Sequence, residues 1–144
     1  MSPKRIGQRF LDYKKALRRL KEVLLEDPAK TDAIIDGTIQ RFEFCFELAW
    51  KLLKDVLHYD GIEVSSPRAV IKESFQKEFI VDGENWIAML NDRNKTSHLY
   101  DEQEALHIYK KIKEQYCALL ENFEKDVSGR VMKIQNEEGE NSLK

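Results

Sequence analysis

The chain has 144 residues, of which 42% are hydrophobic and 35% are charged, and its formal net charge is −2. This length fits one domain, with a hydrophobic core beneath a highly charged surface. Six Gly and three Pro are too few for a turn-rich β-sandwich or a low-complexity linker. No apolar run approaches the roughly 18 residues of a membrane span, and no apolar signal segment follows the start, so we expect a cytoplasmic protein.

Basic residues are concentrated at the start of the chain. Residues 1–21 carry eight Lys or Arg and one acid, whereas residues 22–120 have more acidic than basic side chains. A basic helix is typical of a nucleic-acid contact, and it is equally typical of a solvated helix face.

Hydrophobic residues three and four positions apart predict helices along most of the chain, and no strand-like alternation competes with them. The first helix is expected to end before Asp27-Pro28, because proline cannot continue a helix. A second helix begins near Thr31 and ends at Asp60-Gly61, where glycine tolerates a positive φ. This second helix is apolar on more than one side, which favours a place at the centre of the fold or in a dimer interface.

The second half of the chain predicts two short helices and one long one. Ser66-Pro67 and Asp82-Gly83 are starts of short helices, and Asp101 can cap the long last helix. We therefore expect an all-α protein, an up-and-down four-helix-bundle-like fold with three long helices and two short ones. The predicted domain covers residues 1–128, and residues 129–144 are expected to be a polar C-terminal tail, partly disordered.

The two cysteines and three histidines offer no recognisable metal site. Cys45 and Cys117 lie inside apolar helical patterns and lack metal-ligand spacing, so we expect buried free thiols. The histidines do not form a ligand pair on one helix. No glycine-rich phosphate loop is present either. We therefore expect neither a metal nor a cofactor.

The stretch Leu90–Asp101 is the strongest candidate for chemistry. Arg93 and His98 are five residues apart, so a continuous helix would separate them by about 140°. Asn94, Thr96 and Ser97 hydrogen-bond readily to the backbone and favour a helix break between the two. If the break brings them together, the imidazole can move a proton and the guanidinium can stabilise charge on a phosphate. A solvated loop between helices is the alternative interpretation.

The segment resembles the Arg-x4-His-x-Tyr signature of HEPN-domain proteins, formed here by Arg93, His98 and Tyr100. More narrowly, the chain is similar to the HepT-like group, also called nucleotidyltransferase substrate-binding proteins. Gln40–Lys51 and Trp86–Asn94 fit that group as well, and the resemblance covers about residues 5–127.

The resemblance implies a homodimeric helical bundle that pairs with a minimal nucleotidyltransferase. In members of this kind the HEPN protein is a metal-independent endoribonuclease, the toxin of a type VII toxin–antitoxin pair, and RNA is its substrate. The nucleotidyltransferase is the antitoxin and adenylylates the signature tyrosine. By position, Arg93 stabilises the phosphate, His98 is the general acid or base, Asn94 is a supporting polar residue and Tyr100 is the modification site.

Chemistry gives an independent reason for a dimer. RNA cleavage through a cyclic phosphate needs a base and an acid, and a two-fold axis near His98 would bring two histidines together. Glu43 and Glu47, one turn apart on the second helix, are candidates to orient Arg93 or raise the pKa of His98. An ordinary salt-bridge ladder with neighbouring lysines and arginines is the other interpretation of these two acids.

Two other functions fit the same sequence. The protein can be a non-catalytic subunit that presents substrate to a nucleotidyltransferase, or a helical adaptor in which Arg93 and His98 are incidental. Trp50 and Trp86 can stack on bases, although their positions in the apolar stripes favour the core.

Overall fold

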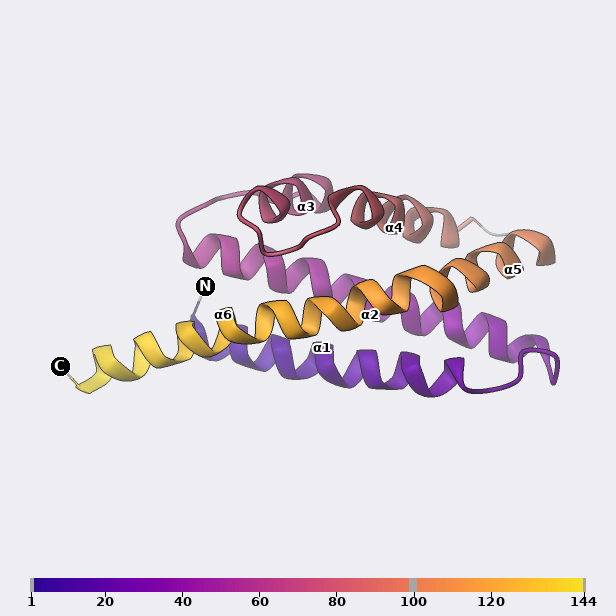
Figure 1. Ribbon diagram of the computed structural model, residues 1–144, viewed down its shortest axis with the longest axis horizontal. Helices are drawn as coiled ribbons and strands as arrows, with labels where there is room; N and C mark the ends of the chain where they lie inside the picture. The colour runs from indigo at the N-terminus through magenta and orange to yellow at the C-terminus, as the bar shows by residue number, and fades with distance from the viewer. Residues whose placement is uncertain (1, 99–100, 144) are drawn as a thin grey trace.

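The computed structural model describes residues 2–98 and 101–143 and has the all-α fold that the sequence predicts. Helices α1 (Pro3–Leu24) and α2 (Asp32–Tyr59) form an antiparallel pair. The short helices α3 (Pro67–Gln76) and α4 (Gly83–Thr96) pack on α2 (Figure 1).

The last three elements form one uninterrupted helix. α5 (Glu102–Lys111) continues through a π-helical turn (Ile112–Tyr116) into α6 (Cys117–Leu143), which runs back along α1 (Figure 1). With this helix counted once, the described residues form the three long and two short helices that were predicted. A π turn changes the register of side chains between the two parts of a helix, and such turns are frequent at functional sites.

The helices begin where the sequence predicts. The side chains of Thr31, Ser66, Asp82 and Asp101 each accept a backbone N–H at the start of a helix. Gly61, directly after α2, has a φ of 84°, a conformation that glycine adopts without strain.

Aromatic residues from different helices meet in the core. The Phe123 ring packs edge-on against Tyr13 and Trp86, with both ring centroids 5.3 Å away. Trp86 is only 2% exposed, so it belongs to the core and offers no surface for base stacking. Cys45 and Cys117 are buried and free, which confirms the prediction for the thiols.

The structure differs from the expected tail after residue 128, because α6 continues as a helix to Leu143. Val131 and Ile134 extend the spacing of the stripe that contains Val127, and all three are buried. The Tyr59 hydroxyl donates a hydrogen bond of 2.7 Å to Glu137 and so ties α6 to the end of α2. The sequence pattern weakens here because only one narrow side of the helix is apolar.

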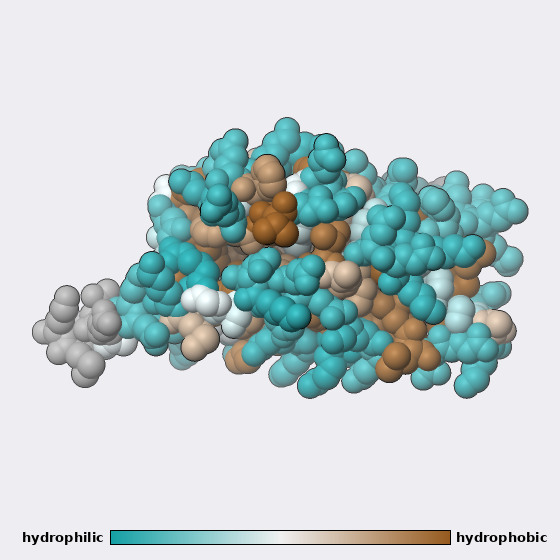
Figure 2. Space-filling model, viewed as in Figure 1, coloured by the Kyte–Doolittle hydropathy of each residue, from teal (hydrophilic) through white to brown (hydrophobic). Residues whose placement is uncertain are grey.

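On the face seen in Figure 2, hydrophilic residues cover most of the surface, and hydrophobic residues gather in separate patches. In the part of the chain that the structure describes, none of the helices combines the length and the apolar character that crossing a membrane requires.

Candidate functional site

Helix α4 ends between the two residues that the sequence singles out. Thr96 is its last residue, so Arg93 and His98 lie on opposite sides of the helix end, as predicted. The Thr96 hydroxyl donates to the Arg93 carbonyl oxygen at 2.6 Å, and the Ser97 hydroxyl donates to the Asn94 carbonyl oxygen at 3.1 Å. These local hydrogen bonds satisfy carbonyl groups that a continuing helix would use.

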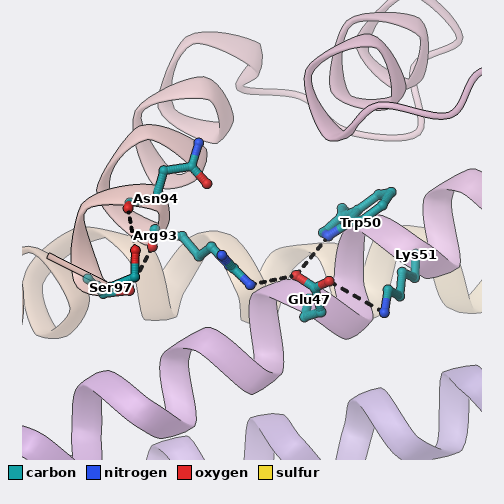
Figure 3. Close-up of polar contacts among 7 residues, drawn as sticks. Glu47, Trp50, Lys51, Arg93, Asn94 and Ser97 are labelled. Atoms are coloured by element: carbon teal, nitrogen blue, oxygen red, sulfur yellow. Dashed lines mark hydrogen bonds and ion pairs between the residues drawn. The ribbon is translucent and has the colours of Figure 1, made fainter.

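Arg93 points from α4 towards α2, where its guanidinium donates a hydrogen bond to the carboxylate of Glu47 (Figure 3). One Arg93 Nη lies 3.2 Å from Glu47 Oε2, and the Trp50 indole N–H donates to the same oxygen at 3.1 Å. Lys51 Nζ lies 3.4 Å from Glu47 Oε1. Two hydrogen bonds and one further ion pair therefore hold the Glu47 carboxylate, and that carboxylate fixes the direction of the guanidinium.

Of the two acids that were candidates to orient Arg93, the structure brings only Glu47 to it. Glu43 is half-buried one turn earlier on α2 and has no hydrogen bond or ion pair among the described residues. Glu47 fits both interpretations of the sequence, because it orients Arg93 and also forms an ordinary ion pair with Lys51 on its own helix.

His98 is exposed and lines a cleft of about 600 Å³ between the end of α4 and helix α5. Asn94, Lys95, His107 and Lys111 are among the other lining residues, and Arg93 is not. Among the described residues no hydrogen bond joins Arg93 and His98: the guanidinium is held by Glu47 of α2, and the imidazole lines the cleft beside α5.

Tyr100, the expected modification site, lies outside the described residues. The chain is described again from Asp101, whose carboxylate accepts the Glu104 backbone N–H at 2.8 Å and starts α5. The supporting residue Asn94 is exposed and lines the same cleft as His98.

Sequence reasoning missed Asp92, the neighbour of Arg93. Asp92 is 5% exposed and accepts hydrogen bonds from the Tyr116 hydroxyl and from Lys111 Nζ, the latter at 3.2 Å. Burial, together with the hydrogen bond to Asp92, raises the pKa of Tyr116 above its usual value. The sequence offered one indication that Asp92 is buried: it follows Met89 by three residues and so lies in the buried stripe of α4.

Asp92 and Arg93 fasten the end of α4 in two directions. Neighbouring residues of a helix point about 100° apart. Asp92 therefore holds this end to the π turn and α5, whereas Arg93 holds it to α2. The two contacts together set the direction in which the end of α4 presents its side chains.

Comparison with known proteins identifies a family for this chain. Residues 8–128 match the family described as nucleotidyltransferase substrate binding protein like. A curated relative, the probable ribonuclease HepT of Haemophilus influenzae, is 36% identical over 86 residues, which are 56% of this chain and 59% of the relative. The chain therefore matches only about three-fifths of that relative's length.

Solved structures share the fold. A Thermus thermophilus protein is 33% identical, with a TM-score of 0.69, and the match covers 83% of this chain and 98% of that protein. A tri-AMPylated HEPN toxin of Shewanella oneidensis, solved in complex with an MNT antitoxin, has a TM-score of 0.72 at 18% identity. That match covers 86% of this chain and 96% of the toxin.

We predict that Tyr116→Phe destabilises the protein at neutral pH by about 1.5–3 kcal/mol, the usual worth of a hydrogen bond to a charged group. Because the pKa of Tyr116 is raised in the folded state, this contribution is complete below pH about 10 and declines at higher pH. Urea unfolding of both proteins at several pH values measures the difference, which should shrink above pH about 10.

Tyr109→Phe is the matched control. Tyr109 is 3% exposed, and its hydroxyl has no hydrogen-bond partner among the described residues, so its loss should cost little or nothing. Equal destabilisation by the two variants would show that the contact with Asp92 does not fasten α4.

Proposed function

The chain belongs to the nucleotidyltransferase substrate binding protein like family, and we propose that it is the endoribonuclease toxin of a type VII toxin–antitoxin pair. The relative named probable ribonuclease HepT supports the activity. The HEPN toxin solved with an MNT antitoxin supports the pairing with a minimal nucleotidyltransferase. In this chain, the observation that carries the proposal is Arg93, held by Glu47 at the helix end that precedes the exposed His98.

The proposed reaction divides the chemistry between Arg93 and His98. His98 removes the proton of a ribose 2′-hydroxyl, whose oxygen then attacks the adjacent phosphorus. The bond to the 5′-oxygen breaks, an acid protonates that oxygen, and a 2′,3′-cyclic phosphate remains. Arg93 stabilises the negative charge on the phosphorane.

The contacts of Arg93 suit this role. Its guanidinium has five N–H donors, and Glu47 accepts from one nitrogen, which leaves donors for phosphate oxygens. The side chain is 33% exposed, so a phosphate in solvent can reach it. No step in this scheme needs a metal ion, and we propose that the reaction is metal-independent.

We further propose that a homodimer completes the site. In one chain Arg93 is held against α2, His98 lines the cleft beside α5, and the reaction needs an acid as well as a base. A two-fold axis near the end of α4 would place a second His98 beside the first site. His107 is the competing source of a second imidazole within one chain, because it lines the same cleft as His98.

The family description itself favours a second candidate function. A nucleotidyltransferase substrate binding protein of the literal kind would present substrate to its partner and cleave nothing. Arg93 and His98 would then contribute to binding only, and the two candidates differ in whether the purified protein cleaves RNA.

We predict that purified protein cleaves total cellular RNA in the presence of EDTA. His98→Ala and Arg93→Gln should each lower the rate at least about a hundredfold, in the range of lost acid–base or electrostatic catalysis. Both residues lie at a partly solvated helix end, so the free energy of unfolding in urea should change by no more than about 1 kcal/mol.

His107→Ala is the control within the same cleft, and it should retain cleavage if the partner copy provides the second histidine. Loss of cleavage in His107→Ala would indicate that His107 of the same chain provides the acid. Absence of cleavage by the unmodified wild-type protein, or full activity of His98→Ala, would contradict the ribonuclease and favour the binding subunit.

We also predict that co-expression with the cognate minimal nucleotidyltransferase adds AMP to Tyr100 and silences cleavage. The phosphodiester would add negative charge to the segment that follows His98 and compete with an RNA phosphate for the cations of the site. Intact and peptide mass spectrometry locate the adduct, and Tyr100→Phe should remain active in the same cells. Tight binding of the partner without modification of Tyr100 would contradict this mode of silencing.

A further inference from the structure

A second cationic surface lies beside the Arg93 site, in a cleft of about 310 Å³ between α1 and α2. We propose that this cleft binds phosphate groups of the same single-stranded RNA that Arg93 contacts. The inference rests on the proposed function for its ligand, and it adds a binding site for the RNA backbone away from the reacting phosphate.

The lining of the cleft is mostly cationic. Arg5 and Arg9 come from α1, and Lys51, Lys54 and His58 come from α2, as does Trp50, the aromatic residue of the lining. Four permanent positive charges and one histidine thus face a space large enough for a phosphate group, and Asp55 is the single acid of the lining.

Asp55 is a buried carboxylate that pairs with one cation of the cleft, Arg9. This residue is 3% exposed, and its Oδ2 lies 2.7 Å from Arg9 Nε as an ion pair, although the geometry is not that of a hydrogen bond. Burial raises the pKa of Asp55, and the charges of Arg9, Arg5, His58 and Lys54 oppose this rise. The four basic groups therefore favour the ionised form of this carboxylate.

Two of the cations remain available for a ligand. Arg9 is paired with Asp55, and Lys51 is paired with Glu47. Arg5 and Lys54 form no ion pair within 4.0 Å among the described residues. A phosphate is the compact anion that such a pair of lysine and arginine side chains recognises.

The cleft and the Arg93 site share Glu47 as a neighbour. Trp50 and Lys51 line the cleft; Trp50 donates a hydrogen bond to Glu47, Lys51 forms an ion pair with it, and Glu47 also holds Arg93. Glu47, Lys51, Lys54 and His58 are spaced by four, three and four residues, so they share one face of α2. At 1.5 Å per residue, Lys54 lies about 10 Å along the helix from Glu47.

The distance between Lys54 and Glu47 along α2 favours a strand over a single nucleotide as the ligand. A single nucleotide at Arg93 would not need cations a further 10 Å or so away, whereas a strand carries a phosphate on each nucleotide and can occupy both places. The exposed Arg5 and the half-buried Lys54 match the electrostatic groove that follows a single strand, whereas Trp50 is buried. We therefore assign the cleft to the RNA backbone and not to a free nucleotide.

The test measures binding of a short fluorescent 2′-O-methyl RNA, which lacks the attacking hydroxyl and is not cleaved. The variant Arg5→Gln/Lys54→Gln removes the two unpaired cations and leaves the Arg9–Asp55 and Lys51–Glu47 pairs in place. The variant Lys72→Gln/Lys77→Gln removes two exposed charges in or beside α3 and is the matched control. Fluorescence anisotropy gives the dissociation constant at several salt concentrations.

We expect the Arg5/Lys54 variant to bind at least about tenfold more weakly than wild type at low salt. The slope of log affinity against log salt should become shallower by about 0.7 for each lost phosphate contact. The control should retain the wild-type slope. Equal affinity and slope in both double variants would overturn the proposal, as would displacement of the RNA by micromolar ADP, which would assign the cleft to a free nucleotide.

Total-RNA cleavage with the same proteins separates this inference from the proposed function. Weakened binding in the Arg5/Lys54 variant, with no cleavage by wild type, would support the cleft and contradict the ribonuclease. Cleavage by wild type, with unchanged binding in that variant, would support the ribonuclease and overturn the cleft.

Discussion

The carboxylate of Glu47 is the contact on which the candidate site depends. It lies on the long helix α2, and it receives Arg93 from α4 together with Trp50 and Lys51 from its own helix. Without a fixed acceptor, a long arginine side chain at a helix end would sample many rotamers. Asp92 complements this contact from the other side, because it binds Tyr116 and Lys111 and so prevents the end of α4 from turning.

Local chemistry made most of the fold predictable. Capping side chains such as Thr31, Ser66 and Asp101 bond the backbone N–H of a residue two or three positions later. Because this interaction is local, the start of each helix can be predicted from neighbouring residues. The break after Thr96 was predictable for the same reason. The continuation of α6 past residue 128 was not, because Val131 and Ile134 form a narrow stripe whose burial depends on packing against distant helices.

The sequence predicted the main residues of the candidate site but not the contacts between them. Arg93, His98 and the choice between Glu43 and Glu47 followed from spacing, but spacing did not decide which carboxylate reaches the guanidinium. The contact of Asp92 with Tyr116 spans 24 residues and depends on the π turn, which no local pattern announced. The cleft between α1 and α2 was hidden likewise, since Arg5 and Lys54 become neighbours only after the two helices pair.

The central claim is that Glu47 positions Arg93 for phosphate chemistry, and Glu47→Gln tests it most directly. We predict that its rate constant for RNA cleavage falls about tenfold to a hundredfold, the cost of a misplaced catalytic group, while the free energy of unfolding changes by no more than about 1 kcal/mol. Glu22→Gln, which removes an exposed carboxylate of α1 that pairs only with Arg18 among the described residues, should leave the rate unchanged. A Glu47→Gln protein that cleaves at the wild-type rate would contradict the account.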